Sequence, residues 1–273
     1  MEYFVSSDGI RLAYLDEGVG PSLLCLAGLT RNSTDFDYLA PHLPDTRLVR
    51  LDARGRGASG HADPATYTVA TEARDALELL DHLGLDRTAI LGTSRGGLIA
   101  MTLAATARDR LAGVCLNDIG PEIAPEGLAA IMTYLGRRPP QKTRADAAAA
   151  RAKFMTGFTN VPMSRWLEEV TRQTRETRDR LDIIYDPQLR AAVEAAASHP
   201  TPDLWPLFDA LQGIPLALIR GAISNILSPS TATEMRRRRP DMAFAEIPDR
   251  GHVPFLDEPQ SLSLVHRFLE NVR

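Results

Sequence analysis

The stretch TAILGTSRGG, residues 88–97, decides the fold. Its first half is a short apolar run typical of a buried strand, and an amphipathic helical pattern begins directly after Ser94. Gly92, Ser94 and Gly96 therefore form a G-x-S-x-G pattern at a strand-to-helix turn. A nucleophilic serine at such a turn has a strained backbone that exposes its hydroxyl, and it requires small neighbours. The alternative is a glycine-rich turn in which the serine only caps the helix.

Outward from this turn, short apolar runs alternate with longer amphipathic ones. This alternation predicts an α/β fold with a mainly parallel eight-stranded sheet and helices on both faces. The first two strands should form an antiparallel hairpin around Asp8 and Gly9. The other strands are expected at residues 22–28, 46–54, 88–94, 111–118, 215–221 and 243–248.

The alternation breaks between residues 121 and 212, which are rich in alanine, arginine and scattered aromatic residues. We expect this segment to be a helical cap, with helices near 125–136, 144–155, 164–176 and 187–197. The core domain would then consist of residues 1–120 and 213–273. Aromatic side chains of the cap either pack within it or line an apolar substrate pocket. The candidates for substrate contact are Tyr134, Phe158, Trp166 and Trp205.

The chain has 273 residues, a formal net charge of -4 and a pI near 5.9. This charge gives no electrostatic reason to expect nucleic acid or an anionic membrane as a partner. The RRRR run at residues 236–239 closes a predicted helix, where the helix dipole favours cations at a solvated end. No signal peptide or apolar run of ~18 residues is visible, which favours a cytoplasmic protein. The oligomeric state stays open, a homodimer included.

The motifs resemble the α/β-hydrolase family, and most closely its small capped esterase and enol-lactonase branch. Besides the serine turn, four stretches follow in the family's order, and the resemblance covers essentially the whole chain. They are LAGLTRNSTDFDYLAPHL (26–43), LDARGRGASG (51–60), NDIGPE (117–122) and GHVPFLDEP (251–259). The resemblance implies a serine hydrolase with an acyl-enzyme intermediate and no metal or organic cofactor. The two cysteines lie in apolar runs and also give no metal site.

The same resemblance implies which groups do the chemistry. A serine hydroxyl is a poor nucleophile near neutral pH unless a base accepts its proton, and His252, after the last strand, holds the family's position for that base. The backbone N–H groups of Leu29 and Arg95 would bind the oxyanion that forms when Ser94 attacks a carbonyl. The Arg95 side chain either attracts a substrate carboxylate or pairs with local acids, and we favour the second.

The acid of the triad is an open question. In the resembled branch an Asp usually stands in an SDIL-like stretch after the cap, but here that place holds Asn225 in SNIL. Such an Asp-to-Asn change in a serine protease costs about 10⁴ in turnover. Asp118 could serve instead, or it could only hold its own turn. Alternatively Asn225 orients His252 through its amide oxygen, or the chain is an engineered form. The SNIL frame narrowly favours position 225.

The predicted substrate is a carboxylic ester or lactone of a medium-sized, mainly apolar small molecule. Two alternatives use the same fold. One is carbon–carbon bond hydrolysis, acyl transfer or a cofactor-free lyase reaction, which a weakened acid would suit. The other is a non-catalytic receptor for a small ligand, for which Asn225 is the only hint.

Overall fold

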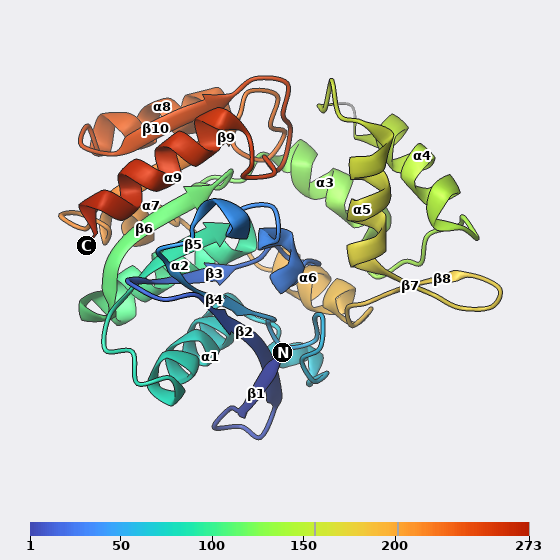
Figure 1. Ribbon diagram of the computed structural model, residues 1–273, viewed down its shortest axis with the longest axis horizontal. Coiled ribbons are helices and arrows are strands. Elements are labelled where there is room, and N and C mark those ends of the chain that lie inside the picture. The colour runs from blue at the N-terminus through green and yellow to red at the C-terminus, as the bar shows by residue number, and fades with distance from the viewer. Residues whose placement is uncertain (156, 201, 273) are drawn as a thin grey trace.

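The computed structural model describes residues 1–155, 157–200 and 202–272. An eight-stranded sheet runs through its centre in the order β1-β2-β4-β3-β5-β6-β9-β10 (Figure 1). Pairing is antiparallel at β1-β2 and β2-β4 and parallel elsewhere, so the mainly parallel sheet and its edge hairpin are confirmed. The strands are β1 (Glu2–Val5), β2 (Arg11–Glu17), β3 (Ser22–Leu26), β4 (Arg47–Leu51), β5 (Thr88–Thr93), β6 (Leu111–Asn117), β9 (Leu216–Gly221) and β10 (Ala243–Ile247).

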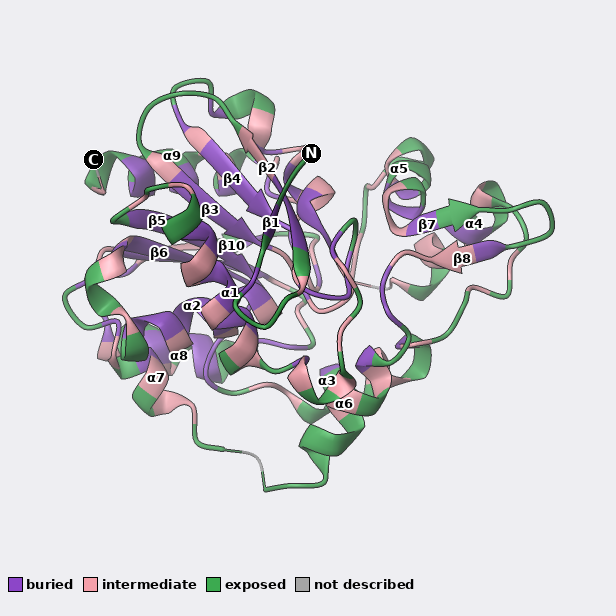
Figure 2. Ribbon diagram, turned by 90° about the horizontal axis from the view of Figure 1, so that it is seen from below, coloured by how far each residue is buried: buried purple, intermediate pink, exposed green. Residues whose placement is uncertain are grey.

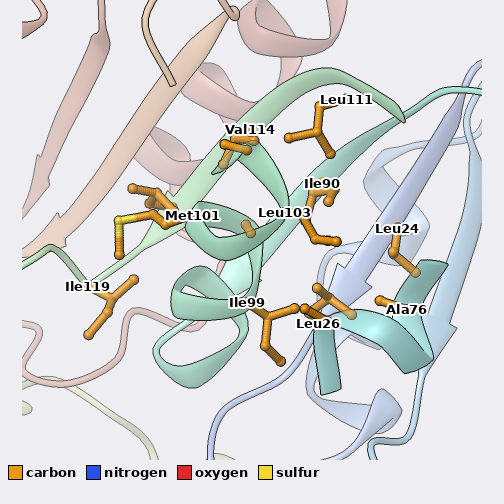
Figure 3. Close-up of a cluster of buried hydrophobic side chains, with 14 of the residues drawn as sticks. Leu24, Leu26, Ala76, Ile90, Ile99, Met101, Leu103, Leu111, Val114 and Ile119 are labelled. Atoms are coloured by element: carbon orange, nitrogen blue, oxygen red, sulfur yellow. The ribbon is translucent and has the colours of Figure 1, made fainter. Parts of the chain in front are cut away.

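Helices cover both faces of the sheet. Alternate residues of a strand point to opposite faces, so β3 sends Leu24 into one hydrophobic cluster and Leu23 into another. The larger cluster packs the sheet against one set of helices, and Figure 3 shows part of it. These are α1 (Val69–His82), α2 (Arg95–Thr106), α7 (Trp205–Asp209) and α8 (Pro229–Arg238). The opposite face packs against α9 (Pro259–Asn271) and two short 3₁₀ helices, Ser33–Phe36 and Ala40–His42.

The inserted segment stands to one side of the sheet (Figures 1 and 2). Two small hydrophobic clusters pack it against the core domain, one through Phe255 and the other through Tyr67. A short hairpin replaces the end of the expected helix at 164–176, because that helix ends at Gln173. The elements are α3 (Pro125–Tyr134), α4 (Arg144–Phe154), α5 (Met163–Gln173), β7 (Thr174–Glu176), β8 (Leu181–Ile183) and α6 (Leu189–Ala197).

Two details of the sequence-based picture change. Helix α7 lies within residues 121–212, yet Phe208 and Leu211 are buried in the larger core cluster rather than in the cap. In the RRRR run, Arg237 and Arg238 pair with Glu234 at the helix end, whereas Arg239 is buried and donates to the carbonyl of Ile214 at 2.7 Å.

Among the described residues, no helix is both long and apolar enough to cross a membrane.

Candidate active site

Ser94 occupies the sharp turn between β5 and α2. Its backbone has φ 51° and ψ −115°, a strained combination for a residue with a side chain. The flanking glycines are required because a Cβ on Gly92 would lie 2.5 Å from the Gly96 carbonyl oxygen, and a Cβ on Gly96 would lie 2.0 Å from that of Leu26. The Ser94 side chain makes no capping bond to α2. The turn therefore presents the hydroxyl outward instead of using it as a helix cap.

His252 connects the Ser94 hydroxyl to a carboxylate. It lies in the loop between β10 and α9, with Nε2 2.9 Å from Ser94 Oγ and Nδ1 2.8 Å from Asp118 Oδ2. In the tautomer that satisfies both contacts, Nδ1–H donates to Asp118 and Nε2 accepts from the Ser94 hydroxyl. Asp118 is fully buried, while the His252 side chain keeps 14% of its surface exposed. This is the hydrogen-bond chain of a serine-histidine-aspartate triad.

Strand register explains why Asp118 reaches this position. Thr93 of β5 pairs with Asn117 of β6, so the residues that follow each strand, Ser94 and Asp118, emerge side by side at the same sheet edge. The next strand, β9, pairs Ile219 with Asn117 and ends beside them at Gly221. The three strands β5, β6 and β9 thus bring their carboxyl ends together.

The loop after β9, residues 222–228, supports the Asp118 carboxylate. Oδ1 accepts from the Gly221 N–H at 2.8 Å, and Oδ2 accepts from the Ser224 hydroxyl at 2.6 Å in addition to His252. A buried carboxylate is costly unless hydrogen bonds replace its lost water, and these donors replace it. Ser224 is itself fixed, because its Oγ accepts from the N–H groups of Ile226 and Leu227 at 3.2 and 3.1 Å.

The expectation that position 225 holds the partner of the imidazole is wrong. The Asn225 side chain is exposed and makes no hydrogen bond to the described residues. The turn in which the Ser224 N–H donates to the Gly221 carbonyl directs Ser224, one residue earlier, toward the acid. Sequence reasoning missed Ser224; its available signal was its place three residues beyond the end of β9. Asp118 already contacts His252, so the geometry does not require an engineered loss of an acid.

The two N–H groups proposed for the oxyanion are free of other partners in the described part of the chain. Arg95 is the first residue of α2, where N–H groups have no intrahelical acceptor, and Leu29 follows β3 and lines the pocket. The Leu29 carbonyl accepts from Arg56 Nε at 2.9 Å, which fixes this loop.

The Arg95 side chain turns away from the pocket and pairs with Glu72 at 2.6 Å, as we favoured from the sequence. Arg56 contacts the same carboxylate at 2.8 Å. Burial alone would raise the pKa of Glu72, but the charges of Arg95 and Arg56 outweigh it and lower that pKa below its ordinary value. This buried ion group holds the start of α2, and hence the serine turn, in place.

A pocket of about 740 Å³ opens over Ser94 and His252. Tyr134, Phe158 and Trp166 line it, and their contact with a substrate stays a prediction. Trp205 lies outside it: its indole N–H donates to Glu122 at 2.9 Å, and Arg238 stacks on its ring at 4.0 Å from the centroid. The Trp205 prediction is therefore wrong, because α7 belongs to the core and not to the cap.

The pocket is more highly charged than the sequence suggested. In addition to the aromatic side chains, its lining includes Arg31, Asp35, Arg137, Arg138, Arg151 and Glu169. No local pattern could have grouped them, because the ion pair between Arg31 and Glu169 joins residues 138 positions apart. The expectation of a mainly apolar pocket describes only part of its wall.

Comparisons with known proteins agree with this architecture. The model of the alpha/beta hydrolase fold family matches residues 21–259, and the chain belongs to this family. It is 34% identical to a 3-hydroxybutyrate-oligomer hydrolase of Cupriavidus necator, over 94% of this chain and 92% of the relative. A crystal structure of an alpha/beta hydrolase from Novosphingobium aromaticivorans has a TM-score of 0.92 and 39% identity, covering 99% and 97% of the two chains. A malate-bound esterase from Thermogutta terrifontis has a TM-score of 0.75 and 26% identity, covering 100% and 99%.

Proposed function

We propose that this protein hydrolyses carboxylic esters of small molecules through an acyl-enzyme on Ser94. The observation that carries the proposal is the continuous hydrogen-bond chain from Ser94 through His252 to Asp118. Each link has the length of an ordinary hydrogen bond, and the carboxylate end is buried and fully supported. A non-catalytic receptor would not need a base hydrogen-bonded to a serine hydroxyl. The hydrogen-bonded triad therefore argues against a receptor role.

The geometry supplies each step of the reaction. Ser94 Oγ attacks the ester carbonyl carbon while His252 Nε2 accepts the hydroxyl proton, and Asp118 stabilises the resulting imidazolium. The N–H groups of Leu29 and Arg95 stabilise the oxyanion. When the tetrahedral intermediate collapses, the ester C–O bond breaks and His252 gives its proton to the departing alcohol oxygen. Water then attacks the acyl-enzyme by the same route, which releases the acid and restores Ser94.

The similarity to a 3-hydroxybutyrate-oligomer hydrolase supports an ester of a hydroxy acid as the substrate class. Such oligomers are joined by carboxylic ester bonds, which this mechanism cleaves. A lactone is an internal ester and would open by the same steps. The pocket volume of about 740 Å³ lies in the range typical of small-molecule sites. We propose that the segment of α3 to α6 acts as the cap that limits which esters reach Ser94.

Removal of the nucleophile tests this function. Ser94→Ala should lower kcat for p-nitrophenyl butyrate by up to about 10⁶, because no other group can form the acyl-enzyme. An organophosphonate probe should label the unaltered protein and leave Ser94→Ala unlabelled, as read by intact-protein mass spectrometry. Ser198→Ala, on an exposed turn, is the matched control and should behave like the unaltered protein. Equal turnover or equal labelling in Ser94→Ala would refute the proposal.

A further inference from the structure

One wall of the pocket beside the nucleophile carries a partly buried group of charges, which we name the charged wall. It consists of Arg31, Asp35, Arg151 and Glu169. It begins close to the reacting atoms: the point where a Cβ on Gly28 would stand is 3.3 Å from Arg31 Cγ and 3.7 Å from Ser94 Cβ. A substrate whose carbonyl lies at Ser94 would therefore extend along this wall.

Arg31 is fully neutralised inside the protein. Its Nε lies 2.6 Å from an Asp35 oxygen, and its Nη2 lies 2.7 Å from a Glu169 oxygen. Burial raises the pKa of Asp35 despite the neighbouring guanidinium of Arg31. Both carboxylates thus bond to Arg31, and together they carry one negative charge more than it neutralises.

Arg151 of α4 balances the remaining negative charge but has no hydrogen bond to a carboxylate. Its Nη1 donates to the neutral amide oxygen of Gln173 at 2.6 Å, and its Nη2 is 3.9 Å from Glu169, too far for a hydrogen bond. Its Nε is buried with no acceptor among the described residues. Burial and the charge of Arg31 lower the pKa of Arg151 below its ordinary value. Part of the Arg151 side chain is accessible and lines the pocket, so an anion there would give this guanidinium a charged acceptor.

The whole pocket, like Arg151, is positively charged. Arg137 and Arg138 join the lining near its rim, where Arg138 pairs with Asp182 at 3.0 Å. The described lining thus holds four arginines and two carboxylates, a formal charge of +2, although the chain carries -4 overall. A concave site with a net positive charge attracts anionic ligands.

We propose that the pocket takes esters that carry a second, ionised carboxylate, and that Arg151 is the main partner of this carboxylate. This inference rests on the proposed ester hydrolysis and names its substrate class. A charge-assisted hydrogen bond to a partly buried guanidinium changes binding by roughly tenfold to a hundredfold. The exposed rim arginines attract the anion, and Arg151 binds it within the pocket.

The test compares a charged ester with an uncharged ester of similar length. Monomethyl glutarate and methyl pentanoate are suitable, with acid release followed by titration at constant pH. The unaltered protein should have a kcat/KM for monomethyl glutarate at least tenfold above that for methyl pentanoate. Arg151→Gln should lower this ratio at least tenfold, whereas Arg151→Lys should retain part of it because it keeps the charge.

Arg144→Gln provides the matched control. Arg144 lies on the same helix but does not line the pocket, so its variant should keep both rates and the ratio within twofold. A ratio near one in the unaltered protein, or an unchanged ratio in Arg151→Gln, would overturn the inference while leaving ester hydrolysis intact. Failure to cleave either ester, together with an unlabelled Ser94, would instead refute the proposed hydrolase.

Discussion

Two loops at the ends of neighbouring strands together provide the acid that contacts His252. The loop after β6 begins with Asp118, which is fully buried and contacts His252 at 2.8 Å. The loop after β9 contains the exposed Asn225 and supplies Asp118 with a hydrogen bond from Ser224 at 2.6 Å. One loop thus provides the charge, and the other provides the donors that stabilise it. A neutral residue in the family's usual acid stretch need not mean that the acid is missing.

The largest expected effect follows from the loss of the charge. Asp118→Asn should lower kcat for a simple ester by about 10⁴, because an amide favours the wrong imidazole tautomer and does not stabilise the imidazolium. Asp109→Asn, at an exposed site just before β6, should leave kcat within twofold. Steady-state kinetics with p-nitrophenyl butyrate measures both variants, and a fall of less than tenfold in Asp118→Asn would contradict the assignment.

A smaller effect should follow from the loss of the support. Ser224→Ala removes one hydrogen bond to the buried Asp118 carboxylate, and a bond of this kind contributes roughly 1.5 to 3 kcal/mol. We expect kcat to fall about tenfold, because Gly221 and His252 still hold the carboxylate. Ser230→Ala, on the exposed start of α8, is the control. A kcat for Ser224→Ala within twofold of the unaltered value would show that Ser224 does not position the acid.

The smallest effect is expected at the residue that the sequence favoured. Asn225→Asp places a carboxylate on an exposed side chain without a hydrogen-bond partner among the described residues, so solvent should screen its charge. We expect kcat to change less than threefold. A tenfold gain under the same assay would mean that position 225 reaches the imidazole during turnover.

The sequence predicted the fold well because its signals were local. Each central strand is a short apolar run, and the Gly92, Ser94 and Gly96 spacing leaves room for one kind of turn only. The hairpin at residues 174–183 was missed because its strands have three residues each, too few to interrupt a helical pattern. Helix α7 was assigned to the cap because nothing in its short sequence shows that it packs on α2.

The site was less predictable because its contacts join distant parts of the chain. His252 and Asp118 are 134 residues apart, and only the register of β5, β6 and β9 brings the carboxylate to the base. A match to the SNIL stretch located the right loop but the wrong residue, since a one-residue offset decides which side chain faces inward. The charged wall had no sequence signal, because Arg31 and Arg151 come from the core and the cap.

The most direct test of the central claim moves the carboxylate from one loop to the other. The double variant Asp118→Asn, Asn225→Asp keeps the formal charge of the chain. It removes the carboxylate at position 118 and places one at position 225. If Asp118 is the acid, kcat of the double variant should stay as low as that of Asp118→Asn, about 10⁴ below the unaltered protein. Recovery to within tenfold of the unaltered kcat would contradict the account, because it would show that position 225 can serve His252.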